Sequence, residues 1–138
     1  MHNNRWCLRI GPWVLASVFF VAGISKGLNP QSTAKAIGTL SGGVIPDWSV
    51  AGLVFVEILL AGWLAFGFLP RAALLATIIL LLSFSLALGA LLVVSPTSPC
   101  GCGLPAFSGN TTVDNSIGIA RNVLLVFIAA LAWPARHS

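Results

Sequence analysis

Residues 72–94 read AALLATIILLLSFSLALGALLVV, a run of 23 residues without a charged side chain. A helix needs about 20 mostly apolar residues to cross roughly 30 Å of bilayer hydrocarbon. In lipid, backbone polar groups must be paired within the segment or within a closed barrel. The run lacks the strict polar–apolar alternation of barrel strands. It therefore predicts a membrane-spanning helix, and this helix decides the fold class.

Three further stretches have the same character, at about residues 8–28, 48–69 and 117–133. Pro70 and Arg71 leave a very tight connection between the second and third spans, and the fourth span is the shortest. We therefore expect an all-α membrane protein, a four-transmembrane-helix bundle that forms a single domain over residues 1–138. Ser32 or Thr33 is expected to cap a short additional helix in the first loop.

The composition agrees with this class. Hydrophobic residues make up 57% of the 138 residues and charged residues only 7%, against roughly 25% in soluble domains. So few charges cannot form a polar shell around a soluble domain of this size. The composition excludes disorder and a secreted disulfide scaffold. It also excludes a nucleic-acid partner, because the net charge of +4 comes from scattered basic residues and not from a basic stripe. The expected surroundings are a lipid bilayer.

The first span starts with basic residues and resembles a signal peptide, but its apolar run is longer than usual and no small-x-small cleavage site follows. We therefore interpret it as a retained helix.

Four spans place both termini on one side of the membrane, with these basic residues: Arg5, Arg9, Arg71 and Arg136. The other side carries Lys26, Lys35 and Arg121.

The lysine and arginine distribution indicates the orientation of the bundle. Lys26 and Arg121 fall within helix ends, so they count less than residues in free loops. We therefore expect a multi-pass protein of the bacterial cytoplasmic (inner) membrane with both termini in the cytoplasm. The loops at residues 29–47 and 95–116 would then face outward.

The second of these loops carries the sequence CGCG at residues 100–103. A disulfide between Cys100 and Cys102 would close a very small, strained ring, and strain makes a disulfide easier to reduce. Such a bridge would hardly stabilise a fold, because it closes almost no chain. If these two cysteines bond to each other, redox exchange is the natural use.

Other interpretations of the cysteine pair remain open. The two thiols are idle at the membrane surface, pair with other chains, or bind a soft metal such as Cu(I) or zinc. We expect no metal site, because a structural zinc site needs four Cys or His ligands. The remaining candidates lie on the opposite side in the expected topology: Cys7, His2 and His137. Cys7 is interpreted as a small apolar residue at a helix end.

Glu57 is the second informative residue, because it falls about nine residues into the second span and so near the middle of the bilayer. Ionisable residues inside a membrane are candidates for function. The alternative is a structural partner for a basic residue, with Lys26 and Arg121 as candidates. We expect both near the outer ends of their helices, Arg121 about one turn into its helix. Their long side chains either extend outward to the interface or point inward, toward Glu57 or the cysteine loop, where a cation would favour a thiolate.

These motifs occur in an order that resembles a known family. They are Arg9 with FFVAGISK at residues 19–26, EILL at 57–60, CGCG at 100–103 and RNVLL at 121–125. The chain resembles the DoxX-like membrane proteins and is most similar to the methylamine-utilisation MauE family. That family usually has Cys-Gly-Cys-Phe-Gly, whereas here Gly103 follows directly and the aromatic residue is displaced to Phe107.

The resemblance implies a four-helix membrane protein associated with maturation of a periplasmic, disulfide-rich dehydrogenase subunit, such as that of methylamine dehydrogenase. It also implies a thioredoxin-like partner. DoxX relatives are associated with quinone-linked sulfur oxidation, which makes a quinone the candidate cofactor.

We therefore expect a membrane thiol–disulfide redox protein in which Cys100 and Cys102 exchange disulfides with a periplasmic partner. Lys26 and Arg121 would favour the thiolate form, and Glu57 would accept or relay a proton. Electrons would pass to a quinone or to a thioredoxin-like protein. The alternatives are a non-enzymatic assembly factor and a DoxX-type subunit of a quinone-linked oxidoreductase, with Glu57 near the quinone head group.

Overall fold

Five helices follow one another in the computed structural model, which describes residues 4–67, 70–96 and 110–133. They are α1 (Asn4–Leu28), α2 (Pro30–Ser41), α3 (Ser49–Phe66), α4 (Pro70–Val94) and α5 (Thr111–Ala132). All except α2 are long and apolar enough to span a membrane. The expected all-α membrane class is confirmed, with four candidate spans.

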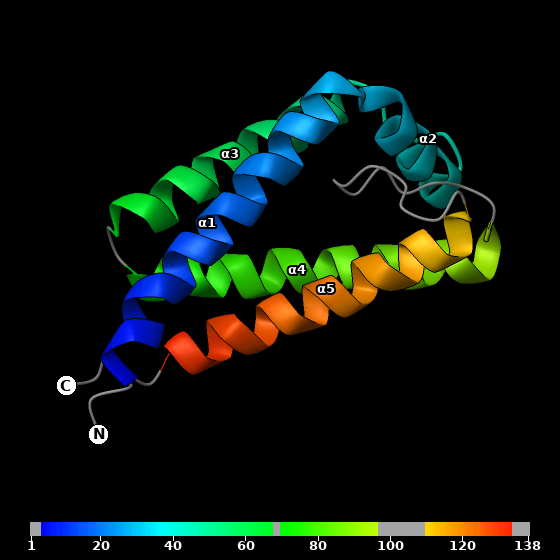
Figure 1. The fold of residues 1–138 in the computed structure, drawn as a ribbon. Coiled ribbons are helices and arrows are strands. Elements are labelled where there is room, and N and C mark those ends of the chain that lie inside the picture. The colour runs from blue at the N-terminus through cyan, green and yellow to red at the C-terminus, as the bar shows by residue number, and fades with distance from the viewer. Residues whose placement is uncertain (1–3, 68–69, 97–109, 134–138) are drawn as a thin grey trace.

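The four long helices form two pairs. α1 packs along α3 and α4 packs along α5, and contacts between the pairs are fewer. Figure 1 shows the pairs meeting near the chain termini and diverging toward the opposite end, where α2 lies. α2 contacts α1, α3 and α4, so it connects the pairs where they diverge. We call this the α2 end of the bundle and the other the terminal end.

The main apolar core lies toward the terminal end. It consists of residues from the middle of α1, the N-terminal half of α4 and the C-terminal halves of α3 and α5: Leu15, Ala16, Phe19, Leu60, Ala61, Leu64, Ala73, Leu74, Leu81, Leu125, Ala129 and Ala132. A smaller cluster at the α2 end joins Ala36 of α2 to Leu88 and Leu91 of α4. Lipid tails are as apolar as these side chains, so close packing holds such helices together.

α1 and α3 approach closely at two glycines. A Cβ atom on Gly23 would lie 3.0 Å from Ile58 Cγ1, and one on Gly27 would lie 3.7 Å from Val54 Cγ1. The absence of a side chain at these positions lets the two backbones come together, as in other small-xxx-small pairs. This approach sets the spacing at which side chains from α1 reach α3.

Two helix boundaries differ from the sequence expectation for reasons of backbone chemistry. α5 begins at Thr111 instead of about residue 117, because the Asn110 side chain caps the helix and accepts a hydrogen bond from the Thr112 backbone N–H at 3.1 Å. Hydropathy alone overlooks this polar first turn. α3 ends at Phe66 instead of residue 69, because Gly67 takes a left-handed conformation with φ of 71°.

The short helix in the first loop also begins earlier than expected. α2 starts at Pro30, with Asn29 at the N-cap position and without a side-chain capping hydrogen bond. The expectation that Ser32 or Thr33 caps this helix is therefore wrong. Proline suits the first turn because its fixed φ is already helical and its missing N–H would have no intrahelical partner there.

Candidate functional site: a buried ion cluster

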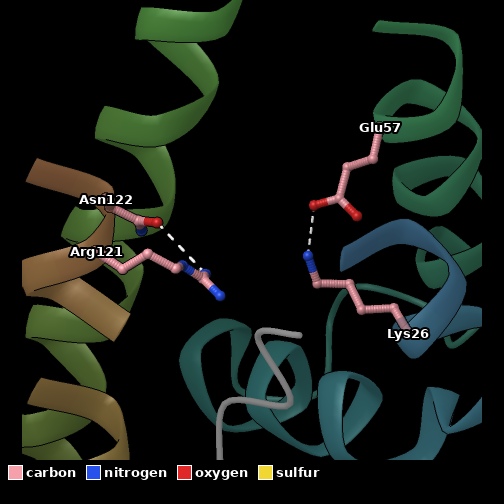
Figure 2. A network of polar contacts seen from close by, with 4 residues as sticks. All are labelled: Lys26, Glu57, Arg121 and Asn122. Carbon is pink, nitrogen blue, oxygen red and sulfur yellow. Dashed lines mark hydrogen bonds and ion pairs between the residues drawn. The ribbon is translucent and has the colours of Figure 1, made fainter. Parts of the chain in front are cut away.

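Lys26 and Glu57 form an ion pair inside the bundle. Lys26 lies in the last turn of α1, and Glu57 is the ninth of the 18 residues of α3. The Lys26 ammonium donates a hydrogen bond to Glu57 Oε1 (Figure 2). Their side chains are only 2% and 0% exposed. The inward interpretation of Lys26 is therefore confirmed, and its side chain does not extend to the surface.

The glycine approach of α1 to α3 explains how this pair forms. A Cβ atom on Gly23 would lie 3.6 Å from Glu57 Cβ. Lys26 follows Gly23 by three residues, and residues three apart share a helix face. Lys26 therefore faces α3 beside the carboxylate. The ammonium also lies 4.4 Å from the centroid of the Phe84 ring of α4, a favourable cation–π distance.

α5 supplies the other polar side chains of the cluster. Arg121 Nη2 donates a hydrogen bond to Asn122 Oδ1 at 3.4 Å. Figure 2 shows the Arg121 guanidinium pointing from α5 toward the region where the Lys26 ammonium meets Glu57. Arg121 interacts electrostatically with both, attractively with Glu57 and repulsively with Lys26. Three helices therefore bring two cations and one carboxylate together.

The position of Arg121 differs from the sequence expectation. We expected it about one turn into its helix, near the outer end. It is instead the eleventh of the 22 residues of α5, because that helix begins at Thr111. Arg121 therefore lies midway along α5. Glu57 lies midway along α3, and at these positions the two residues interact. Arg121 is partly buried, and its Nε atom is fully buried.

Glu57 Oε2 and Asn122 Nδ2 are buried and have no hydrogen-bond partner among the described residues. Asn122 is 1% exposed, so its amide nitrogen is a fully buried donor. Leaving such a group unpaired costs about 1–3 kcal/mol. The cluster therefore contains buried polar atoms in addition to the Lys26–Glu57 ion pair, and Glu57 Oε2 can accept a hydrogen bond while Asn122 Nδ2 can donate one.

Cys100 and Cys102 lie outside the described residues. The described chain ends before them at Pro96 and resumes after them at Asn110, and both positions are at the α2 end (Figure 1). The Thr112 hydroxyl donates a hydrogen bond to the Pro96 carbonyl oxygen at 3.3 Å. This bond ties the two ends of the cysteine-containing segment together.

Sequence reasoning identified three members of the cluster and missed the role of Phe84. Lys26, Glu57 and Arg121 stand out because each places a charge in an apolar segment. Phe84 is one of 8 phenylalanines in the chain, and nothing in its local sequence predicts contact with Lys26. Asn122 carries a weak signal, as a second polar residue directly after Arg121 within an apolar helix.

The fold and the cluster define a multi-pass membrane protein with charged side chains buried between its helices. The family model of methylamine utilisation protein MauE matches residues 4–135. The chain belongs to this family, and it is a membrane protein linked to methylamine utilisation. No curated protein and no solved structure matches it significantly.

Proposed function

We propose that this MauE-family protein exchanges thiols and disulfides with a partner outside the cytoplasmic membrane, and so supports formation of the partner's disulfides. The observation that carries the proposal is the CGC sequence at residues 100–102, in a segment whose ends are joined by the bond between Thr112 and Pro96. A single glycine between two cysteines permits only a strained disulfide, which is easily opened.

The reaction balances as an exchange of two electrons and two protons. A thiolate of the partner attacks the Cys100–Cys102 disulfide and forms a mixed disulfide, which releases one cysteine as a thiolate. A second thiol of the partner then displaces the remaining cysteine. The partner leaves with a new disulfide, and Cys100 and Cys102 become a dithiol. Reoxidation passes two electrons to the disulfide of a thioredoxin-like protein or to a membrane quinone.

The buried cluster has a proposed role in this exchange. Lys26 in the last turn of α1 and Arg121 midway along α5 place positive charge inside the bundle, between its middle and the end that carries the cysteine segment. Positive charge near a cysteine favours its thiolate, which is the reactive form. Glu57 would accept or relay the proton released when a thiol ionises. These roles make the three residues positioning and proton-handling groups for the cysteines.

The proposed location is the bacterial cytoplasmic membrane, with both termini in the cytoplasm and the α2 end outward. The first turn of α4 contains Arg71, at the same end of the bundle as the chain termini (Figure 1). Basic residues on that side favour a cytoplasmic location. The partner would then be a disulfide-containing periplasmic protein, such as a methylamine dehydrogenase subunit, with a thioredoxin-like protein beside it.

A trapping experiment tests this function. The single variants Cys100→Ser and Cys102→Ser each leave one thiol that can attack but cannot resolve. We expect at least one of them to accumulate a mixed disulfide that reducing agent releases, and the double variant to lower the disulfide content of the partner in cells. Cys7→Ser is the matched control and should change neither result.

The opposite result would favour a non-enzymatic assembly factor. In that case, neither single variant would form a mixed disulfide, and the partner's disulfides would be unchanged in the double variant. Expression in the membrane must be equal for all variants, because a loss of the protein itself would also lower the partner's disulfide content. Immunodetection of a C-terminal tag in the membrane fraction provides that comparison.

A further inference from the structure

The Lys26 ammonium lies between partners from two different helices. Its hydrogen-bond acceptor among the described residues is Glu57 Oε1 of α3, and the centroid of the Phe84 ring of α4 lies 4.4 Å from Nζ. A cation over the face of an aromatic ring is attracted by the quadrupole of the ring, most strongly where water is excluded. Lys26 is only 2% exposed, so the carboxylate and the ring both stabilise its charge.

The ring is the group that α4 contributes to Lys26. The serines on either side of it bond within their own helix, since the hydroxyls of Ser83 and Ser85 donate to backbone carbonyl oxygens of the preceding turn at 2.8 Å and 2.9 Å. Phe84 therefore offers the ammonium an aromatic face. Such a face attracts a cation but has no atom that takes up a proton from it.

The two oxygens of Glu57 have different surroundings. Oε1 accepts the hydrogen bond from Lys26, whereas Oε2 is buried and has no hydrogen-bond partner among the described residues. Oε2 is therefore the oxygen that can take up a proton while Oε1 keeps its bond to Lys26. Protonation makes the carboxyl group neutral, so Lys26 then loses the negative charge beside it. The attraction of the Phe84 ring does not depend on that proton.

We propose that Phe84 is a positioning residue, whose ring holds the charged Lys26 side chain in the cluster while Glu57 carries a proton. The proton comes from a thiol that ionises, and it converts the Glu57 carboxylate into a neutral acid while Lys26 keeps its own protons. Glu57 can then gain and lose a proton without release of Lys26 from the cluster. This inference rests on the proton-handling role proposed for Glu57.

Thermal unfolding of the full chain in nanodiscs of uncharged lipid tests this role, with fluorinated phenylalanines in place of Phe84. Fluorine withdraws electron density from the ring face, so each added fluorine weakens the attraction for a cation while the size of the ring changes little. The series runs from 4-fluoro- to 3,4,5-trifluorophenylalanine. We expect trifluorination to lower the Tm of the wild type by about 2–4 °C.

Glu57→Gln supplies the decisive comparison. It keeps the shape of the side chain and a carbonyl oxygen for Lys26, and it is neutral like the protonated acid. If the ring holds the ammonium beside a neutral partner, the fall in Tm on fluorination of Phe84 should persist in this variant. Glu57→Met, which is also neutral, serves if Glu57→Gln is not recovered from the membrane.

Two controls separate attraction of the cation from packing of the ring. The double variant Lys26→Met with Glu57→Leu removes the cation without leaving the carboxylate unpaired, so fluorination of Phe84 should no longer lower its Tm. Phe19 is the matched control for the ring itself, because it is a buried phenylalanine in the main apolar core. Fluorination of Phe19 should not lower the Tm of the wild type.

The proposal predicts a fall in Tm that grows with each fluorine, persists beside a neutral residue at Glu57 and disappears with Lys26. An unchanged Tm in the wild type would overturn it, as would an equal fall without Lys26 or loss of the fall in the neutral variants. The double cysteine-to-serine variant should show the same series as the wild type. Failure of the redox function, which the mixed disulfide reports, is therefore distinguishable from failure of this role.

Discussion

Lys26 and Glu57 depend on each other more strongly than residues of an exposed ion pair would. Both side chains are buried, and each charge is stabilised mainly by the other. Removing one partner leaves an uncompensated charge in a medium of low dielectric constant, which is much worse than removing both. The pair is therefore a structural element of the bundle as well as a candidate functional group.

Lys26→Met should destabilise the folded protein by about 3–5 kcal/mol, because it leaves the Glu57 carboxylate buried without its partner. The double variant Lys26→Met with Glu57→Leu should recover most of this loss. Unfolding in nanodiscs, followed by circular dichroism, measures both effects.

Lys35→Met is the matched control for this prediction. Lys35 lies on α2 and is exposed, so its replacement should change stability by less than about 0.5 kcal/mol. If Lys26→Met were as stable as the wild type, or if the double variant were no better than the single one, the mutual dependence of the pair would be disproved.

At the scale of the helices, the approach of α1 to α3 determines where the charges meet. Gly23 and Gly27 give α1 a face without side chains toward α3. Lys26 lies on this face and so reaches Glu57. A side chain at Gly23 would separate the helices just where Glu57 lies, and both packing and the ion pair would be affected.

Gly23→Leu should destabilise the bundle by about 1–3 kcal/mol, because it inserts a side chain into a filled contact. The nearest atom to a new Cβ is Ile58 Cγ1 at 3.0 Å. Thermal unfolding and the amount of protein in the membrane fraction measure the effect.

Gly52→Leu provides the comparison on α3. A Cβ at Gly52 meets no atom within 4 Å, and the residue is exposed, so the leucine would face lipid. Its stability should equal or slightly exceed that of the wild type, because leucine has a higher helix propensity than glycine. Equal stability of the two leucine variants would contradict the close approach at Gly23.

At the scale of the whole molecule, apolar and polar side chains separate along the bundle. The main apolar cluster fills the terminal end, where the helix pairs meet. The ion cluster extends from the middle of the bundle, where Glu57 and Arg121 lie midway along α3 and α5, to Lys26 in the last turn of α1. The buried charged side chains thus lie between the main apolar core and the α2 end.

The proposed orientation predicts which residues react with an impermeant maleimide in intact spheroplasts. In a variant that keeps Cys102 and replaces the other cysteines by serine, the thiol should be labelled from outside after mild reduction. In a cysteine-free protein that carries Arg71→Cys, labelling should require permeabilised membranes. The reverse pattern would place the α2 end in the cytoplasm and remove the proposed partner.

Several features could be predicted from local sequence because they depend on local chemistry. The long apolar segments predict spanning helices regardless of their neighbours, since the backbone must pair its own polar groups in lipid. Charges within such segments identify Lys26, Glu57 and Arg121 as unusual, because each is costly there. The boundaries of α3 and α5 were less accurate, because hydropathy does not register the capping of Asn110 or the left-handed Gly67.

The sequence by itself therefore determined the class of protein, its spans and its candidate charged residues, since hydrophobicity and charge cost belong to each segment alone. Only the tertiary structure decided which charges meet. The pairing of Lys26 with Glu57, the contact with Phe84 and the approach of Arg121 from α5 depend on how four helices pack. That packing follows from close contacts between residues far apart in the chain, such as Gly23 and Ile58, which no single segment specifies.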